Sequence, residues 1–227
     1  MDEQKLTVGR RSLLTGMGAA AAGALTPGAT GAQRRNSGFR PARHDGDAWL
    51  DELPGQHRVL IDTSYALGGA EALLYANNIL NAHADAYDGK DEDYAIVICW
   101  RHHATPFAWD DAAWEKYGEL LSRMMEISDE QAGRHFEANP MNLPGRPDLL
   151  NGTDTIDKTT ARGVRIAICN HATQEIAKGV AAMTGGSVDE IYSDFVAAAV
   201  PESRFVPAGV LATTRAQEYG YSLLFSG

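Results

Sequence analysis

The stretch Val164-Arg165-Ile166-Ala167-Ile168-Cys169-Asn170 decides the fold that we expect of this chain. Its short apolar run with β-branched residues is typical of a strand that is buried on both faces. Asn170 follows at once and can cap a helix, which the pattern extends to about residue 183. Residues 58–63 and 94–100 are similar apolar runs, and each predicts a further buried strand.

Strands and helices alternate outward from this stretch. Gly68-Gly69 indicates a turn before a helix over 70–86. Later helices and strands are expected in these ranges: helices over 110–127, 187–199 and 212–219, and strands over 204–207 and 221–225. Alternation of nearly all-apolar strands with helices predicts an α/β domain, a mostly parallel five-stranded sheet with helices on both faces.

The first 32 residues have the three regions of a signal peptide. A polar start precedes Arg10-Arg11, a mild apolar run of Ala and Gly covers 16–25, and small residues continue to Ala32. The paired arginines resemble a twin-arginine signal. Three positions depart from its usual pattern: Gly9, Leu13 and Thr15. We therefore expect export, to the periplasm or beyond, with a disordered amphipathic tail as the alternative.

The remaining chain divides into a leader and a domain. Residues 33–56 are basic at first, contain glycine and lack periodicity, so we expect a flexible leader. The domain is predicted over 57–227, with a polar, proline-containing insertion at about 128–163. Short helices could form near 129–136 and 155–161. An insertion of this length is usually a lid, a binding loop or an interface arm.

Charge excludes several classes of partner. Without residues 1–32 the chain has 17 basic and 28 acidic side chains, a net charge of −11. Binding to nucleic acid needs clustered Lys and Arg, and binding to anionic membrane surfaces needs them too. We therefore expect no nucleic-acid partner, and no membrane association once the signal is removed.

The sharpest candidate for chemistry is Cys169. It lies at the carboxyl end of a predicted strand, where α/β sheets place their active crevice. The free N–H groups at the start of the next helix would stabilise a thiolate, and His171 could add positive character. His102, after the strand over 94–100, is expected at the same edge. The alternative is a buried, inert cysteine, because free cysteine is often buried.

Other combinations of these residue types are weaker. A metal site could be built from Cys and His side chains, namely Cys99, His102, His103, His135 and His171, but their spacing matches no strong motif. A disulfide between Cys99 and Cys169 would fail if another strand lay between theirs. The chain lacks the glycine-rich nucleotide motifs and the Gly-x-Ser-x-Gly elbow, so we expect no cofactor and disfavour an α/β-hydrolase.

Four segments together resemble the DsrE/DsrF-like family. The resemblance lies in the Asn-rich stretch 73–81, the strand and His-containing turn 95–102, the strand 163–170 that ends in the family's cysteine, and the C-terminal pattern in 206–210 and 217–221. It covers about residues 58–227. It implies a flavodoxin-like three-layer sandwich that forms homo-oligomers.

The resemblance also implies an activity. Some members of that family carry sulfur as a persulfide on the cysteine that matches Cys169, between a donor and an acceptor protein. It suggests a sulfur carrier of sulfurtransferase type, with His102 and His171 as polar assistants. Two departures matter: the known relay members act inside the cell, and the turn after His102 and the insertion that follows differ from the family pattern. A non-catalytic periplasmic binding or assembly module and a metal-binding protein are the alternatives.

Overall fold

The computed structural model describes residues 40–143, 149 and 151–227. Residues 41–227 form one compact unit. The predicted signal peptide, residues 1–32, lies outside the described residues, as does most of the N-terminal half of the predicted leader.

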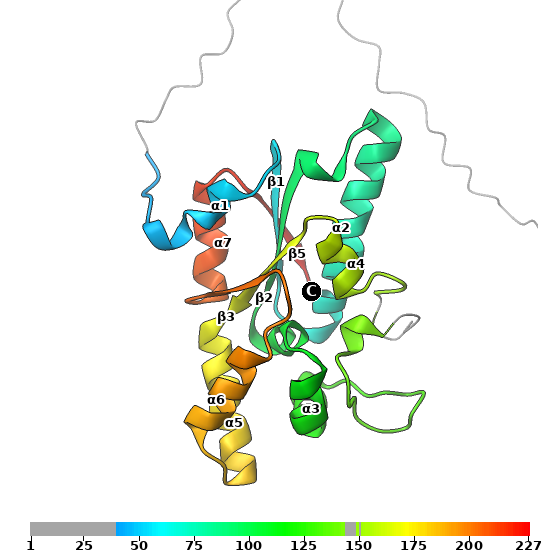
Figure 1. Ribbon diagram of the computed structural model, residues 1–227, viewed down its shortest axis with the longest axis vertical. Coiled ribbons are helices and arrows are strands. Elements are labelled where there is room, and N and C mark those ends of the chain that lie inside the picture. The colour runs from blue at the N-terminus through cyan, green and yellow to red at the C-terminus, as the bar shows by residue number, and fades with distance from the viewer. Residues whose placement is uncertain (1–39, 144–148, 150) are drawn as a thin grey trace, which may run out of the picture. The chain divides into compact units, whose positions relative to one another are not determined.

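A five-stranded, all-parallel sheet forms the centre of this unit (Figure 1). Its order is β4-β3-β2-β1-β5. The strands are β1 (His57–Thr63), β2 (Tyr94–Trp100), β3 (Arg165–Cys169), β4 (Ser203–Val206) and β5 (Ser222–Ser226). The three-layer α/β fold expected from the sequence is therefore confirmed. The strand order differs from the 2-1-3-4-5 order of flavodoxin, and it makes β2 and β3 direct neighbours.

Crossover handedness explains which helices cover which face. The steps from β1 through β4 all move in one direction, so right-handed crossovers place their helices on one face. That face carries α2 (Ala66–Tyr87), α3 (Asp111–Met125), α4 (Ile156–Ala161), α5 (Asn170–Thr184) and α6 (Val188–Ala197). The last step returns across the sheet from β4 to β5. Its helix α7 (Gly209–Glu218) therefore packs on the opposite face, beside α1 (Trp49–Glu52).

The first face holds the larger core. Its fully buried aromatic side chains include Trp100, Phe107, Trp109 and Trp114. Phe107 belongs to the 3₁₀ helix η3 (His102–Ala108), which closes the carboxyl end of β2. These rings fix the loop after β2, and the candidate site begins in that loop.

Helix α2 begins earlier than the sequence indicated and includes Gly68 and Gly69, which were expected to form a turn. A Cβ atom at Gly68 would lie 2.4 Å from the carbonyl oxygen of Ser226, and one at Gly69 would lie 2.9 Å from the Phe107 ring. Both glycines are therefore needed for close packing of the helix rather than for a turn, and the expectation of a turn is corrected.

The predicted leader is shorter than expected. Trp49 and Leu50 of α1 are buried against α7, and the Tyr221 hydroxyl donates to the Leu50 carbonyl at 2.8 Å. Arg215 also forms an ion pair with Asp47 at 3.0 Å. Two large apolar side chains that the sequence pattern did not single out hold this segment on the sheet. The expectation of a flexible leader up to residue 56 is thus wrong for the part around α1.

The described part of the insertion packs on the body of the domain. The expected helix near 129–136 does not form; Asp129 and Arg134 instead pair across a tight turn. The second expected helix is present as α4. Asn139 anchors the loop between them, because its side-chain amide donates to the carbonyl oxygens of Phe107 at 2.8 Å and Trp109 at 2.6 Å.

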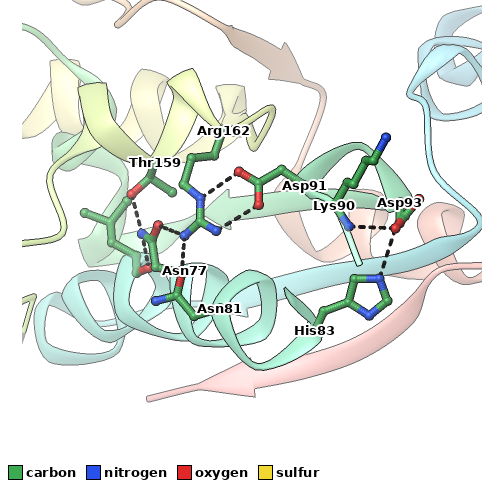
Figure 2. A network of polar contacts seen from close by, with 9 residues as sticks. Asn77, Asn81, His83, Lys90, Asp91, Asp93, Thr159 and Arg162 are labelled. Carbon is green, nitrogen blue, oxygen red and sulfur yellow. Dashed lines mark hydrogen bonds and ion pairs between the residues drawn. The ribbon is translucent and has the colours of Figure 1, made fainter. Parts of the chain in front are cut away.

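A polar network holds the end of the insertion against α2 (Figure 2). The Arg162 guanidinium donates to both carboxylate oxygens of Asp91 at 2.8 Å and to the side-chain oxygens of Asn77 and Asn81 at 2.9 Å. The buried Asn77 amide donates in turn to Thr159 at 2.7 Å. Two asparagines of the Asn-rich stretch 73–81 therefore hold Arg162 in place.

Candidate functional site

The structure places Cys169 at the N-cap of α5, at the carboxyl end of β3. Its backbone is extended, and its sulfur accepts a hydrogen bond from the backbone N–H of Ala172 at 3.4 Å. The first N–H groups of a helix have no partner within the helix and carry its positive dipole end. The sulfur therefore lies where negative charge is stabilised.

A second helix contributes to the same sulfur. The backbone N–H of Gly209, the first residue of α7, donates to Cys169 Sγ at 3.2 Å. Helix α7 has 10 residues and α5 has 15, so both are long enough to carry a dipole. The N-termini of two helices from opposite faces of the sheet thus meet at one thiol.

The contact with Gly209 depends on the absence of a side chain there. A Cβ atom on Gly209 would lie 2.5 Å from the Cβ of Arg101, closer than real Cβ atoms approach. The Arg101 side chain crosses this position and forms a two-pronged ion pair with Asp62, with distances of 2.7 and 2.9 Å. The hydrogen bonds to Asp62 raise the pKa of Arg101, more than partial burial lowers it. Arg101 is therefore a charged but already paired neighbour of the thiol.

His102 and His103 lie beside this ion pair at the start of η3. Their rings stack with centroids 4.1 Å apart, and Tyr65 packs edge-on against both. His102 has φ of 53°, in the left-handed region that histidine tolerates better than most residues. Burial, and then the neighbouring His102, lower the pKa of His103, which favours its neutral form.

A cavity of about 410 Å³ lies beside the thiol, and its wall includes Arg101, His103 and Gly209. It includes all three residues that the sequence proposed for catalysis, Cys169, His171 and His102. The rest of its wall is mainly apolar and comes from α3, α5 and the start of α7. The volume lies within the usual range for small-molecule sites. The structure therefore brings the predicted residues together, while their catalytic role stays a prediction.

Cys99 has a different environment. It is fully buried under α7, and burial raises the pKa of its thiol far above the usual range, so the thiol stays protonated. Cys99 pairs in register with Ala167, two residues before Cys169. Strand geometry then places the two cysteine Cα atoms roughly 8 Å apart, beyond the reach of about 7 Å for a disulfide. Both cysteines are free. The offset in register, rather than an intervening strand, separates them.

The set of metal ligands that the sequence suggested does not assemble. Within residues 40–143, 149 and 151–227, no group of three or more His, Cys, Asp or Glu side chains is arranged to hold a metal ion. Cys99 is buried in the core under α7, and His135 follows the turn of the insertion and does not line the cavity. The metal-binding alternative therefore has no ligand set among these residues.

Sequence reasoning missed several residues of the site. It did not single out Arg101, and it quoted Gly209 only as part of a C-terminal pattern. The signal for Gly209 is a glycine at the first position of a helix that follows a strand, where a backbone N–H is left free. The apolar wall gives no such signal, because the same residue types also form ordinary cores.

The fold and the site together define an α/β protein with one thiol in a mainly apolar cavity at the strand ends. No family model matches the chain, and no curated protein matches it. A solved structure of a protein of unknown function from Methanobacterium thermoautotrophicum is similar to it, with 14% sequence identity and a TM-score of 0.38. The similarity covers 75% of this chain and 99% of that one. Among the described residues, no helix is both long and apolar enough to cross a membrane.

Proposed function

We propose that this protein accepts a sulfane sulfur on Cys169 and carries it as a persulfide. The observation that carries the proposal is the convergence of the Ala172 and Gly209 amides on Cys169 Sγ, in the wall of a cavity large enough for a donor molecule. Hydrogen bonds from backbone N–H groups stabilise negative charge on sulfur, and the thiolate is the nucleophilic form of cysteine.

The reaction that fits this site is a displacement at sulfur. The Cys169 thiolate attacks the sulfane sulfur of a polysulfide or related donor, and a new S–S bond forms. The S–S bond of the donor breaks, and its electron pair leaves with the remaining fragment. The helix N-termini then stabilise the charge on the persulfide. His102 and His171, in the same cavity, can supply a proton to the leaving fragment.

The intact mass of the protein after incubation with inorganic polysulfide or thiosulfate tests the proposal. We expect a gain of one sulfur atom in the unchanged protein and no gain in Cys169→Ser. Cys99→Ala is the matched control, because the Cys99 thiol is buried and protonated, and it should gain the sulfur normally. An undiminished gain in Cys169→Ser would contradict the proposal.

We also propose that the protein acts after export, as a homo-oligomer that passes its sulfur to an acceptor protein. The paired Arg10 and Arg11 in the N-terminal stretch support export. Exposed apolar side chains such as Val210 and Leu211 are suited to a contact with another chain. Replacing both arginines by lysine should retain the protein in the cytoplasm, as fractionation would reveal. Unchanged export would count against a twin-arginine signal.

A further inference from the structure

We propose that the sulfur donor for Cys169 is an organic persulfide with a linear apolar chain. This inference rests on the proposed function and names its substrate class. It is carried by the shape of the cavity, by its lining and by the state of its charged residues.

The cavity extends along α5, from His171 to Met183. The residues of α5 that line it lie on one face of the helix and are mostly apolar: His171, Ala172, Glu175, Ile176, Gly179, Val180 and Met183. At 1.5 Å per residue, this face extends about 16 Å away from the thiol end. A volume of about 410 Å³ over that length gives a mean cross-section of roughly 25 Å². Such a channel has room for one extended chain rather than for a bulky ring system.

The wall is apolar where the chain would lie. Leu120 and Met124 of α3 line the cavity together with the apolar residues of α5. At roughly 30 Å³ for each water-sized group, the cavity holds about a dozen non-hydrogen atoms. A small inorganic anion such as thiosulfate would leave most of this apolar space unfilled.

The charged groups do not favour an anion either. Among the described lining residues, Arg101 is paired with Asp62, and Glu175 forms an ion pair with Lys178 at 2.7 Å. The lowered pKa of His103 keeps that ring neutral. The whole chain has a net charge of −10, which repels anions at a distance. The helix N-termini therefore stabilise charge at the reacting sulfur itself, while these charged side chains are already paired and give an anionic donor no further advantage.

The reaction balances with this donor. The Cys169 thiolate attacks the outer sulfur of R–S–SH, and the S–S bond of the donor breaks. The products are the protein persulfide, which keeps the proton of the outer sulfur, and the thiolate R–S⁻. A proton from His102, His171 or solvent converts R–S⁻ to the thiol. The apolar chain R stays in the channel until the thiol dissociates.

The test is the rate at which the full-length protein gains one sulfur atom, followed by intact mass. The donors are a series of n-alkyl persulfides from ethyl to decyl, with inorganic polysulfide as the reference. We expect the second-order rate constant for sulfur gain to rise by about fourfold for each added methylene until the channel is filled. Gly179→Leu should remove this dependence, because a Cβ there meets no atom within 4 Å and the side chain would enter the channel. Met183→Gln, at an exposed position, should weaken the dependence without affecting folding.

Gln174→Leu is the matched control, because Gln174 is exposed on the same helix and does not line the cavity. It should leave both the chain-length series and the reaction with inorganic polysulfide unchanged. Equal rates for all chain lengths, or a dependence that survives in Gly179→Leu, would overturn this inference alone. No sulfur gain from any donor would overturn the proposed function and this inference with it.

Discussion

Gly209 shows how much of the site depends on single residues. Its N–H reaches the sulfur of Cys169. This approach requires a glycine, because Arg101 occupies the space that a side chain at position 209 would need. Gly209→Ala must move either the start of α7 or Arg101, and both changes weaken the hydrogen bond. We therefore expect the thiolate to be stabilised less, and its reaction with iodoacetamide near neutral pH to slow by roughly tenfold, which corresponds to the loss of about one hydrogen bond to a charged group.

Gly46→Ala is the control for this variant, because a Cβ at Gly46 meets no atom within 4 Å and Gly46 is not part of the cavity. It should leave the alkylation rate unchanged. If Gly209→Ala reacted as fast as the unchanged protein, the contact from α7 would contribute nothing to the state of the thiol.

At the scale of elements, Arg162 connects α4, α2 and the turn before β2. Its planar guanidinium serves Asp91, Asn77 and Asn81 at once, and a lysine ammonium cannot reproduce that geometry. Arg162→Lys should therefore lower the free energy of unfolding by about 1–2 kcal/mol at pH 7, because Asn77 is buried and loses a partner. Urea unfolding measures this.

The same network predicts a pH dependence. The hydrogen bonds from Arg162 lower the pKa of Asp91 below its value in the unfolded chain. Their contribution is present above that unfolded value, near 4, and is lost as pH falls below it. The difference in the free energy of unfolding between Arg162→Lys and the unchanged protein should therefore shrink in acid. Arg134→Lys is the control, because the exposed pair of Arg134 with Glu137 should contribute under about 0.5 kcal/mol.

At the scale of the whole described unit, the first and last segments stabilise each other. Tyr221, just before β5, is buried and donates to the carbonyl of Leu50 in α1. Burial raises the pKa of Tyr221 to about 12, above the value near 10 in an unfolded chain. The contribution of the protonated Tyr221 hydroxyl to the stability of the folded unit is therefore complete below pH 10 and is lost as pH rises toward 12.

We expect the unit to lose about 2–3 kcal/mol of stability between these two pH values through Tyr221 alone. Tyr221→Phe should flatten this alkaline loss and lower stability at pH 7 by about 1 kcal/mol, because the hydrogen bond is missing. Thermal unfolding as a function of pH measures both effects. An alkaline loss of the same size in Tyr221→Phe would show that other groups cause it.

The local pattern of apolar residues was enough to predict several helices and strands. The buried strands that end at Trp100 and Cys169 and the helix that comes next follow from short apolar runs, and all are present in the structure. The expected cap is wrong by one residue, because the N-cap is Cys169 and Asn170 is the first residue of the helix. The expected start of α2 was wrong, because tertiary packing there overrides the local conformational preference of glycine. Gly68 and Gly69 have low helix propensity, yet they lie within α2 because another backbone and the Phe107 ring pack directly against them.

By itself, the sequence determined the α/β class, the parallel sheet and the position of Cys169 at a strand end, because these depend on residues close together along the chain. Only the tertiary structure decided that β2 and β3 are neighbours, that Gly209 reaches the thiol and that Arg101 is already paired with Asp62. The physical reason is distance along the chain. Gly209 lies 40 residues from Cys169, and Arg101 lies 39 from Asp62, so only the packing of the sheet and its helices brings them together.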